Sequence, residues 1–268
     1  MSDTVLVTGG TGTLGRLLVP RLREAGHEVR VLSRKGDGAG VVTGDLSTGE
    51  GVREAVAGAD LVVHCAGSAK GDGEKARNLV AALPGGVRHL VYISVVGADR
   101  VPIESGIDRA MFGYYGAKHA GEQAVIGSGL PWTILRATQF HDLIATFFRM
   151  QRFSPAVFAP AFSLQPIAVE DVARRWVELL DADAAGRAPD IGGPETRTGR
   201  DLAGAFLAAR GSRRPTLPLR LPGRTYAAYA AGANLVPGEP YGRPTFAEFL
   251  ASHDDGLAAR DARGRTDA

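Results

Sequence analysis

Apolar residues in the first 140 positions follow two alternating patterns: short runs rich in β-branched residues, and longer stretches with helical spacing. The short runs predict strands at Thr4–Thr8, Glu28–Leu32, Val41–Thr43, Leu61–Cys65, His89–Ser94 and Trp132–Arg136. Because these runs are almost continuously apolar, we expect strands that are buried on both faces, as in a parallel sheet covered by helices. The alternation predicts an α/β fold with a doubly wound parallel sheet of the Rossmann type.

Stretches with helical spacing connect these predicted strands. The first follows the first strand, and the residues on its apolar face are Leu14, Leu17, Leu18, Leu22 and Ala25. Gly26 stands directly after that face, where glycine is a typical helix terminator. Further helices are predicted over Lys75–Leu83 and Tyr114–Ile126, and the second leads into the turn Gly127–Gly129. Strands and helices therefore alternate as βαβ units.

The pattern loosens in the second half of the chain. Helices are predicted over Phe140–Phe153 and Val169–Leu180, with proline-containing segments between them. Six prolines lie from Pro215 to Pro244, which indicates irregular connections there.

Length and pattern together predict one domain over residues 1–252. We expect its core in residues 1–140 and a small C-terminal lobe mainly in residues 141–252. Residues 253–268 are polar and aperiodic, so they are predicted to form a disordered tail.

Charge and cysteine content narrow the class of partner. The 31 basic and 29 acidic residues leave a net charge of +2 without a Lys- or Arg-rich run, so neither nucleic acid nor a membrane is indicated. A small molecule is the expected partner, and crossover helices that can pair between subunits leave a homodimer open. The single cysteine, Cys65, cannot form an internal disulfide, and the chain enters its first strand without a leader pattern. We therefore expect a cytoplasmic protein.

A glycine-rich turn follows the first predicted strand. It reads Thr8-Gly9-Gly10-Thr11-Gly12-Thr13-Leu14-Gly15 and opens the first predicted helix. Gly9 permits a tight turn, Gly12 lets the backbone approach a pyrophosphate, and Gly15 allows close packing of helix on strand. Free N–H groups and the positive end of the helix dipole favour an anion at this place. Its position between a strand and an amphipathic helix predicts a dinucleotide site.

The end of the second predicted strand indicates which dinucleotide binds. Ser33-Arg34-Lys35 stands where NAD-selective sites carry an acidic residue for the ribose hydroxyls. An arginine can hold a 2′-phosphate through two hydrogen bonds and the lysine adds charge, so NADP is favoured over NAD. The alternatives are that Arg34 and Lys35 only face solvent, or that Asp37 turns toward the ribose.

A weaker signal follows the third predicted strand. In Gly44-Asp45-Leu46, the Asp45 carboxylate could accept a hydrogen bond from an adenine amino group. The alternative is an ordinary turn in which aspartate is favoured for backbone reasons.

Tyr114 and Lys118 are the strongest candidates for chemistry. They are four residues apart, so at the start of a helix both point from one face. An ammonium beside a phenol stabilises the phenolate and allows the tyrosine to exchange a proton with a carbonyl or alcohol oxygen. The alternative is a surface tyrosine beside a solvated lysine. Tyr115 lacks the one-turn relation to Lys118.

Other reactive side chains have simpler interpretations. The histidines lack ligand spacing, so no metal site is predicted. Cys65 ends an apolar strand and is expected to be a small buried hydrophobic residue. His141 could donate to a substrate, but a surface histidine followed by a helix-capping Asp142 explains the pair equally well.

The chain resembles the atypical short-chain dehydrogenase/reductase superfamily, in its NmrA-like NAD(P)-binding branch, over about Val5 to Leu250. The matching segments are Thr8–Gly15, Ser33-Arg34, Asp45-Leu46, Cys65-Ala66-Gly67, Tyr114–Lys118, Pro131–Phe140, Gln165–Ile167, Glu170–Ala173 and Gly192–Glu195.

The resemblance implies an NAD(P) site with phosphates at the glycine turn, adenine near Asp45, and nicotinamide between Ala66-Gly67, Lys118 and the loop Ala137–Phe140. The expected cofactor-binding residues are Gly9, Thr11, Gly12, Thr13, Leu14, Gly15, Ser33, Arg34, Lys35, Asp45, Leu46, Ala66, Gly67, Lys118, Ala137, Thr138, Gln139 and Phe140.

One position departs from the pattern of active members. They usually carry a Ser or Thr after the fifth strand to orient the substrate oxygen, and here the segment is Ile93-Ser94-Val95-Val96-Gly97. Ser94 is the hydroxyl available, and it stands a residue or two early.

The leading hypothesis is an NADPH-dependent oxidoreductase that transfers hydride to a carbonyl, quinone or related group of a small molecule. Tyr114 would donate the proton, Lys118 would tune it and hold the ribose, and Ser94 would orient the substrate. The first alternative is a non-catalytic NADP-sensing protein, which is favoured if Ser94 points into the core. The second is an epimerase or isomerase that uses bound cofactor transiently.

Overall fold

A computed structural model describes residues 3–36, 38–67, 71–104 and 106–253 of the chain. The chain forms two compact units. Unit 1 contains Met1–Ala137 and Val169–Ile191, and unit 2 contains Thr138–Ala168 and Gly192–Ala268. The predicted tail from residue 254 onward lies outside the described residues.

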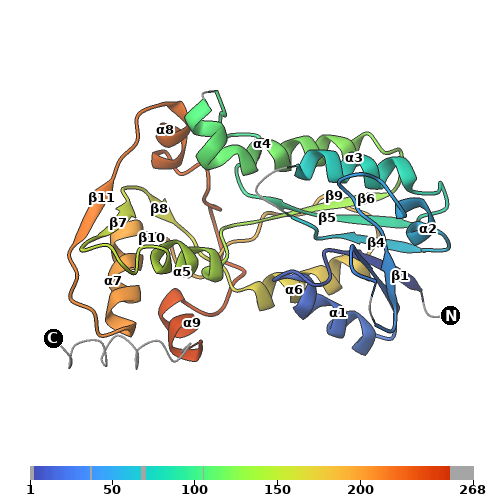
Figure 1. Cartoon of the computed structure of the whole chain (residues 1–268), viewed down its shortest axis with the longest axis horizontal. Helices are drawn as coiled ribbons and strands as arrows, with labels where there is room; N and C mark the ends of the chain where they lie inside the picture. Colours follow the sequence, from blue (N-terminus) through green and yellow to red (C-terminus); the bar gives the residue numbers. More distant parts are fainter. Residues whose placement is uncertain (1–2, 37, 68–70, 105, 254–268) are drawn as a thin grey trace. The chain divides into compact units, whose positions relative to one another are not determined.

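Unit 1 is built on a seven-stranded parallel sheet in the order β3-β2-β1-β4-β5-β6-β9 (Figure 1). The strands are β1 (Thr4–Thr8), β2 (Glu28–Ser33), β3 (Val41–Thr43), β4 (Leu61–His64), β5 (His89–Val95), β6 (Trp132–Ala137) and β9 (Gly186–Arg187). The order changes direction between β1 and β4, so the carboxyl ends of these two strands mark the point where such sheets bind ligands. The predicted Rossmann fold is therefore confirmed.

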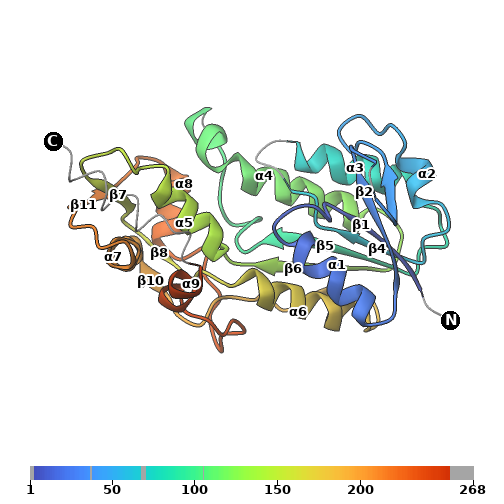
Figure 2. The same cartoon turned by 60° about the horizontal axis from the view of Figure 1, so that its bottom comes forward.

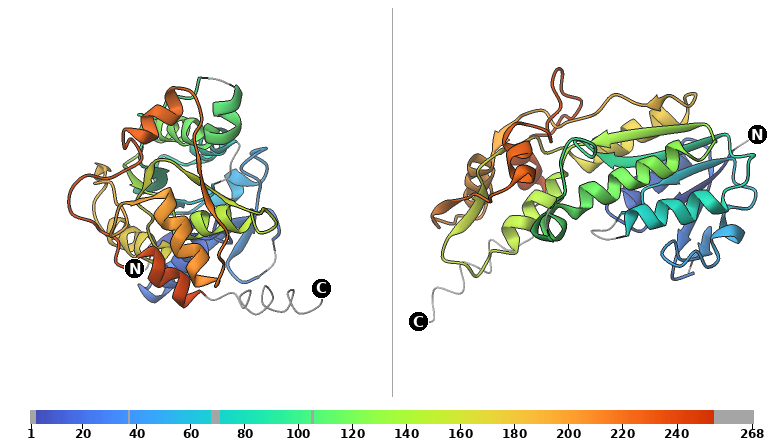
Figure 3. Two further views of the ribbon diagram at one scale, coloured as in Figure 1. Left: turned by 90° about the vertical axis from the view of Figure 1, so that its left-hand side faces the viewer. Right: turned by 90° about the horizontal axis from the view of Figure 1, so that it is seen from above.

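Helices cover both faces of this sheet (Figure 1). One face carries α1 (Gly15–Glu24) and α6 (Val169–Leu180), which pack against each other. The other carries α3 (Asp72–Ala82) and α4 (Gly106–Ile126), which run side by side (Figure 3), and α2 (Val52–Val56) packs against α3.

Apolar burial explains the places of these elements. β4 and β5 are buried at every residue, as their continuous apolar sequences predict. α6 buries one stripe of residues, Val169, Val172, Ala173, Trp176, Leu179 and Leu180, whose spacing is that of a single helical face. The apolar face of α6 therefore returns Val169–Ile191 to unit 1, although this segment follows residues that belong to unit 2.

Unit 2 is a smaller mixed structure (Figure 2). Its helices are α5 (His141–Arg149), α7 (Gly199–Ala209), α8 (Arg224–Ala230) and α9 (Phe246–Ser252). Its strands form two pairs: β7 (Val157–Pro160) with β11 (Thr216–Leu219), and β8 (Ser163–Leu164) with β10 (Arg197–Thr198). The core between them includes Phe148, Phe206, Phe246 and Phe249.

Two helices of unit 2 begin with a complete capping box. Thr198 accepts a hydrogen bond from the backbone of Asp201, whose side chain accepts one from the backbone of Thr198, and Thr245 and Glu248 form the same arrangement. Each box satisfies backbone N–H groups that the first turn of a helix leaves without partners. These motifs define the starts of α7 and α9.

Candidate functional site

The glycine turn after β1 has the geometry that a dinucleotide needs. Gly9 has φ +73°, and a Cβ at this position would lie 2.5 Å from the backbone nitrogen of Ala66. A Cβ at Gly15 would lie 2.2 Å from the carbonyl oxygen of Gly9, so helix and turn touch there. A Cβ at Gly12 would meet only that same oxygen, at 3.2 Å. The turn is therefore closed at Gly9 and Gly15 and open at Gly12.

No side chain caps the helix behind this turn. Leu14 occupies the capping position of α1 and supplies no side-chain hydrogen bond, and the first turn has no acidic residue. Thr11, Gly12 and Thr13 are exposed, whereas Leu14 and Gly15 are buried. The exposed backbone at a positive helix end, with no side chain neutralising it, fits a bound pyrophosphate.

The carboxyl ends of β2 and β3 lie next to each other. Ser33 pairs in register with Thr43, so Arg34 and Lys35 leave the sheet close to Asp45. Arg34 and Lys35 are both exposed. The position is open to a charged ligand, as the predicted 2′-phosphate site requires, while Asp37 lies outside the described residues.

The side chain of Asp45 stabilises the turn that follows it. Its Oδ1 accepts a 2.7 Å hydrogen bond from the backbone nitrogen of Ser47, and this bond, with the charges of Arg34 and Lys75, holds the pKa of the Asp45 carboxyl below its ordinary value. The turn interpretation of Asp45 is thus present in the structure, and the charged carboxylate faces two basic groups. The side chain of Leu46 lies in the hydrophobic core, so only its backbone is available to a ligand.

Lys118 is completely buried, which the sequence did not indicate. Its side chain is 1% exposed, and Nζ donates to the carbonyl oxygen of Ile93 at 3.0 Å. The ammonium also forms an ion pair with Asp72, Nζ to Oδ2 at 3.2 Å, and Asp72 is itself 1% exposed. Asp72 is the first residue of α3, so the ion pair joins α3 to α4.

Aromatic rings complete the surroundings of the lysine. Nζ of Lys118 lies 5.5 Å from the centre of the Tyr114 ring and 5.0 Å from that of Tyr92. A Cβ at Gly67 would lie 3.6 Å from Lys118 Nζ and equally far from Asp72 Oδ2, so the Ala66-Gly67 turn covers the ion pair. The structure brings Tyr114, Lys118 and Gly67 together, as the sequence predicts.

Burial keeps the other titratable groups near Lys118 neutral. Desolvation, aided by the charge of Lys118, lowers the pKa of His64 to about 3. Desolvation also raises the pKa of Cys65 to about 12 and that of Tyr92 to about 12, against the opposing effect of the same lysine. A thiol with a raised pKa is a poor nucleophile, although Cys65 is partly exposed rather than buried as predicted.

Ser94 points away from the open edge of the sheet. It is 3% exposed and pairs in register with Arg136 of β6. Its Oγ lies near enough to Glu122 to help lower the pKa of that carboxyl, although it makes no hydrogen bond of standard geometry within the described residues. The hydroxyl therefore faces the buried side of α4.

Glu122 belongs to a second buried cluster of charges. Arg136 donates two hydrogen bonds of 2.7 Å to the two oxygens of Glu122 and one of 2.9 Å to Asp99. Arg187 adds an ion pair with Glu122 at 3.1 Å. Burial raises the pKa of the Glu122 carboxyl, but the hydrogen bonds and charges of Arg136 outweigh it, so the pKa lies below the ordinary value.

The remaining predicted cofactor residues divide between the two units. Ala137 ends β6 in unit 1, whereas Thr138, Gln139 and Phe140 belong to unit 2. There the Thr138 hydroxyl donates to the carbonyl oxygen of Gln165, and Gln139 and Phe140 pair with Ile167.

His141 has a structural place. It is fully buried, stacks on Phe249, and its Nε2 lies 3.1 Å from the carbonyl oxygen of Pro244. Of the two interpretations of this residue, contact with a substrate and a surface position, the structure of unit 2 shows neither.

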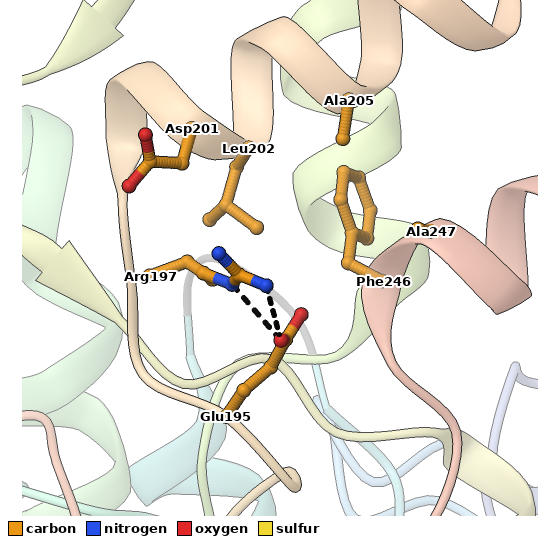
Figure 4. Close-up of a pocket in the computed structure, with 7 residues that line it drawn as sticks. All are labelled: Glu195, Arg197, Asp201, Leu202, Ala205, Phe246 and Ala247. Atoms are coloured by element: carbon orange, nitrogen blue, oxygen red, sulfur yellow. Dashed lines mark hydrogen bonds and ion pairs between the residues drawn. The ribbon is translucent and has the colours of Figure 1, made fainter.

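A pocket of about 140 Å³ opens in unit 2 (Figure 4). Its lining residues are Glu195, Arg197, Asp201, Leu202, Ala205, Phe246 and Ala247. The Arg197 guanidinium pairs with Glu195 at 2.8 Å across it. The pocket is smaller than the roughly 300–1,000 Å³ of typical ligand sites and contains no residue of the predicted cofactor site.

The described residues also bear on metal binding and on membrane insertion. They contain no group of three His, Cys, Asp or Glu side chains with the geometry of a metal site. Within the same ranges, no helix has the length and apolar character that crossing a bilayer requires.

Known proteins have similar sequences and similar folds. A family model described as NAD(P)H-binding matches residues 9–183, so the chain belongs to this NAD(P)H-binding family. The resemblance to the atypical short-chain dehydrogenase/reductase superfamily is thereby confirmed. Relatives and structural neighbours in this superfamily include reductases and epimerases.

Curated relatives include two reductases. The chain is 32% identical over 208 residues to (4-alkanoyl-5-oxo-2,5-dihydrofuran-3-yl)methyl phosphate reductase of Streptomyces griseus, covering 74% of this chain and 70% of that protein. It is 30% identical over 207 residues to ceramide reductase of Caulobacter vibrioides, covering 68% and 62%. It also spans 24% of the length of an uncharacterized Mycobacterium tuberculosis protein, to which it is 26% identical over 227 residues.

Solved structures show the same fold at low sequence identity. An NADPH-dependent quinone oxidoreductase from Escherichia coli, complexed with NADPH, matches with a TM-score of 0.75 and 16% identity over 92% of this chain and 99% of that one. A triphenylmethane reductase from Citrobacter with NADP(H) matches with a TM-score of 0.74 and 17% identity over 93% and 99%.

Sequence reasoning did not find Asp72. An acidic residue in the first turn of a helix has an ordinary explanation in the helix dipole, so Gly71-Asp72-Gly73 carries no specific signal. Its partner, Lys118, is 46 positions further along the chain, and only the packing of α3 beside α4 brings the two together.

Proposed function

We propose that the protein is an NADPH-dependent oxidoreductase that transfers hydride to a carbonyl, quinone or related unsaturated group of a small molecule. One observation carries the proposal: the Lys118 ammonium is held beneath the Ala66-Gly67 turn and against the Tyr114 ring. This turn abuts Gly9, the first residue of the glycine turn. Proton-transfer groups and a pyrophosphate cradle therefore meet at the carboxyl edge of β1 and β4.

Each side chain has a role that follows from its contacts. The cofactor, when bound, supplies the hydride. Tyr114, which is half-buried, donates the proton to the developing substrate oxygen. Lys118 stabilises the resulting phenolate and presents an N–H to the nicotinamide ribose, since Ile93 and Asp72 account for two of its three donors among the described residues.

NADP rather than NAD is proposed because of the charges at the end of β2. Arg34 and Lys35 are exposed side chains with basic character at the position where an NAD-selective protein would carry a carboxylate. The charge of Arg34 helps to lower the pKa of the Asp45 carboxyl, so the basic end of β2 lies near the turn after β3, where the adenosine would bind.

Unit 2 supports a substrate with an apolar chain and an anionic group. Its described residues contain ten arginines, no lysine and five acidic side chains, a net charge of +5. The exposed large hydrophobic residues of the described chain all lie in this unit, and they are Leu143, Met150, Phe153, Phe158 and Leu217. The substrate named for the Streptomyces griseus relative carries an alkanoyl chain and a phosphate.

Titration of nicotinamide fluorescence tests the cofactor assignment. We expect wild type to bind NADPH more tightly than NADH, and Arg34→Ala to weaken NADPH binding by about 10–100-fold, the effect of one charged hydrogen-bond donor. NADH binding should change little. Arg53→Ala, on the exposed side of α2, is a matched control and should leave both affinities unchanged. Failure of wild type to bind either nucleotide would refute the proposal.

The rate of NADPH oxidation in the presence of substrate tests the proposed role of Tyr114. With NADPH and a panel of quinones and alkanoyl butenolides, each with and without a phosphate group, Tyr114→Phe should lower kcat by about 10²–10⁴-fold. Tyr115→Phe removes a hydroxyl from the neighbouring residue, which lacks the one-turn relation to Lys118, and should retain activity. Equal loss in both variants would exclude Tyr114 as the proton donor.

A second candidate function has an observation in its favour. Ser94 faces the buried side of α4, so the usual hydroxyl for orienting a substrate oxygen is absent from the open edge. A non-catalytic, NADP-responsive binding protein would have this arrangement. Tight NADPH binding without oxidation of NADPH by any substrate in the panel would favour this function. Purification with bound cofactor that no substrate consumes would point to the epimerase alternative.

A further inference from the structure

Lys118 is a buried cation that pairs with one carboxylate among the residues that the structure describes. Transfer of an ammonium from water to a protein interior is costly unless an anion and hydrogen-bond acceptors replace the water. Ile93 supplies a carbonyl oxygen at 3.0 Å and Asp72 a carboxylate oxygen at 3.2 Å. Because the side chains of Lys118 and Asp72 are each about 1% exposed, solvent cannot substitute for either charge of the pair.

The other titratable groups around the lysine offer no comparable partner. From β4 and the turn after it, His64 and Cys65 are neutral, with a pKa of about 3 and about 12 respectively. From β5, Tyr92 has a pKa of about 12 and presents its ring face. Lys75 of α3 is a second cation in this region.

The helix that carries Lys118 adds two further groups. Tyr114 presents its ring face to the ammonium. Glu122 lies one turn further along α4, where Arg136 and Arg187 engage its carboxylate. Within the described part of the chain, Asp72 is therefore the carboxylate that pairs with Lys118.

We propose that Asp72 is the positioning residue of Lys118: its carboxylate keeps the buried ammonium charged and fixed beneath the Ala66-Gly67 turn, so that the remaining N–H is directed to the cofactor ribose. Asp72 acts through the lysine and touches neither substrate nor cofactor. The inference depends on the proposed function only in naming the ribose as the ligand.

Electrostatics support this assignment. Burial by itself lowers the pKa of Lys118, but its tyrosine neighbours and the charge and hydrogen bond of Asp72 outweigh that effect, so the pKa of the ammonium lies above its ordinary value. Tyr92 remains neutral up to a pKa of about 12 and contributes no negative charge in the physiological range. Removal of Asp72 takes away one of the groups that oppose desolvation, so Lys118 would lose its proton at a lower pH.

The test is the pH dependence of NADPH affinity in wild type and Asp72→Asn, followed by nicotinamide fluorescence from pH 7 to pH 9.5. Asparagine keeps the shape of the side chain and removes its charge. Wild type should keep its affinity across this range. In Asp72→Asn, Kd should rise by about 10–100-fold as the lysine loses the proton that makes it a charged donor.

Asp171→Asn is a matched control. Asp171 is 2% exposed, lies in the first turn of α6 and pairs with Arg174, so it shares burial, helix position and a basic partner with Asp72. This variant should retain the wild-type pH dependence. The proposal would be overturned if Kd depended on pH in the same way in Asp72→Asn and wild type. It would also be overturned if Asp171→Asn showed the same rise in Kd as Asp72→Asn.

A second measurement applies even if Asp72→Asn folds poorly. Removing one member of a buried ion pair leaves an uncompensated charge, whereas removing both does not. The double variant Asp72→Asn/Lys118→Met should therefore be more resistant to urea than Asp72→Asn alone. If the double variant is as unstable as Asp72→Asn, Asp72 serves the fold rather than the lysine and the proposal fails.

These measurements separate this inference from the proposed function. The affinity profile needs no substrate, so a protein that binds NADPH but reduces nothing still tests the role of Asp72. The urea comparison needs no cofactor, so it remains decisive if wild type binds neither nucleotide.

Discussion

Helix α4 takes part in two buried clusters of charge that differ in how completely their charges are matched. One turn apart on this helix, Lys118 faces Asp72, and Glu122 faces Arg136. Glu122 receives two hydrogen bonds from Arg136 and an ion pair from Arg187, and Arg136 also holds Asp99. Lys118 has one carboxylate, one carbonyl and two aromatic ring faces.

The difference separates a structural cluster from one suited to a ligand. The arginine cluster joins β6, α4 and β9 through a planar group whose donors are well matched to its acceptors. The lysine cluster lies under the Ala66-Gly67 turn, of which Gly67 is exposed. The Lys118 ammonium has three N–H donors, and the contacts with Ile93 and Asp72 account for two of them among the described residues. Matched buried charges hold elements together. A lysine donor that has no partner among the described residues fits the proposed binding role.

The largest expected effect on stability comes from breaking the matched cluster. Glu122→Ala leaves Arg136 buried without its main partner, so we expect it to lower the free energy of unfolding by about 3–5 kcal/mol. Urea denaturation measures this loss. Glu178→Ala, which removes a solvent-exposed partner of Arg175, should cost no more than about 0.5 kcal/mol. Similar losses in the two variants would mean that the Glu122 cluster contributes no more to the free energy of unfolding than an exposed ion pair does.

Acidification should affect the lysine cluster first. The folded state holds the pKa of His64 at about 3, against an ordinary value of 6.5. Between these values the unfolded chain binds a proton that the folded chain excludes, so stability is fully present above pH 6.5 and falls as the pH is lowered. From pH 6.5 to 4.5 this histidine should cost about 2–3 kcal/mol.

Urea denaturation of wild type and His64→Asn at several pH values measures this contribution. Asparagine can keep a hydrogen bond to Thr8, the present partner of His64, but does not titrate. The variant should therefore show a shallower loss of stability below pH 6.5. An unchanged slope would show that His64 accepts a proton in the folded state.

Two substitutions in the glycine turn distinguish a glycine that the fold needs from a glycine that NADPH binding needs. Gly9→Ala places a Cβ 2.5 Å from the Ala66 nitrogen at φ +73°, so it should lower stability by about 1–3 kcal/mol. Gly12→Ala meets only one oxygen, at 3.2 Å, and should change stability by less than about 1 kcal/mol. The same substitution should weaken NADPH binding by about tenfold or more, because a Cβ would stand between the backbone and the pyrophosphate.

Calorimetry and nicotinamide fluorescence, applied to both glycine variants, provide the measurements. If Gly12→Ala bound NADPH as tightly as wild type, the phosphates would have to lie elsewhere.

The smallest effect is expected in unit 2. Thr245→Ala removes the side-chain acceptor at the start of α9 and should cost about 1 kcal/mol in urea denaturation. Thr196→Ala, at an exposed position outside any helix, should stay within about 0.5 kcal/mol of wild type. A neutral Thr245→Ala would show that α9 does not depend on its capping box.

The predictability of the fold differs between the two units for physical reasons. Most strands of unit 1 are apolar runs, and β1 has its predicted boundaries because burial on both faces leaves little room for polar residues. β3 also has its predicted boundaries, although it is an edge strand without a buried residue. α4 begins at Gly106, eight residues before its predicted start, because its first two turns have no regular apolar stripe. Unit 2 has strands of only two to four residues, too short to show a period.

Two helices of unit 2 nevertheless have local sequence motifs at their starts. Thr198-x-x-Asp201 and Thr245-x-x-Glu248 are capping boxes, and each precedes a run with helical spacing. The predicted helix over Phe140–Phe153 ends at Arg149, where Gln151 turns the chain through hydrogen bonds with the backbone of Phe158. That pairing spans seven residues and follows no helical spacing, so the apolar pattern could not predict it.

The candidate site shows the same division. The glycine turn and the Tyr114–Lys118 pair are local motifs, and the sequence predicts both. The burial of Lys118, its pairing with Asp72 and the surroundings of Ser94 depend on α4 lying against β5 and on α3 lying beside α4. Those are tertiary facts, and a single sequence contains no local pattern for them.

The order of segments along the chain has a consequence for synthesis on the ribosome. Unit 1 contains Met1–Ala137 and then, after an excursion into unit 2, Val169–Ile191. The emerging protein therefore completes six strands before the apolar face of α6 exists to lie beside α1. At about 5–20 residues per second, that part of the sheet waits several seconds for its cover. During this interval the nascent chain exposes an apolar surface that a chaperone can recognise.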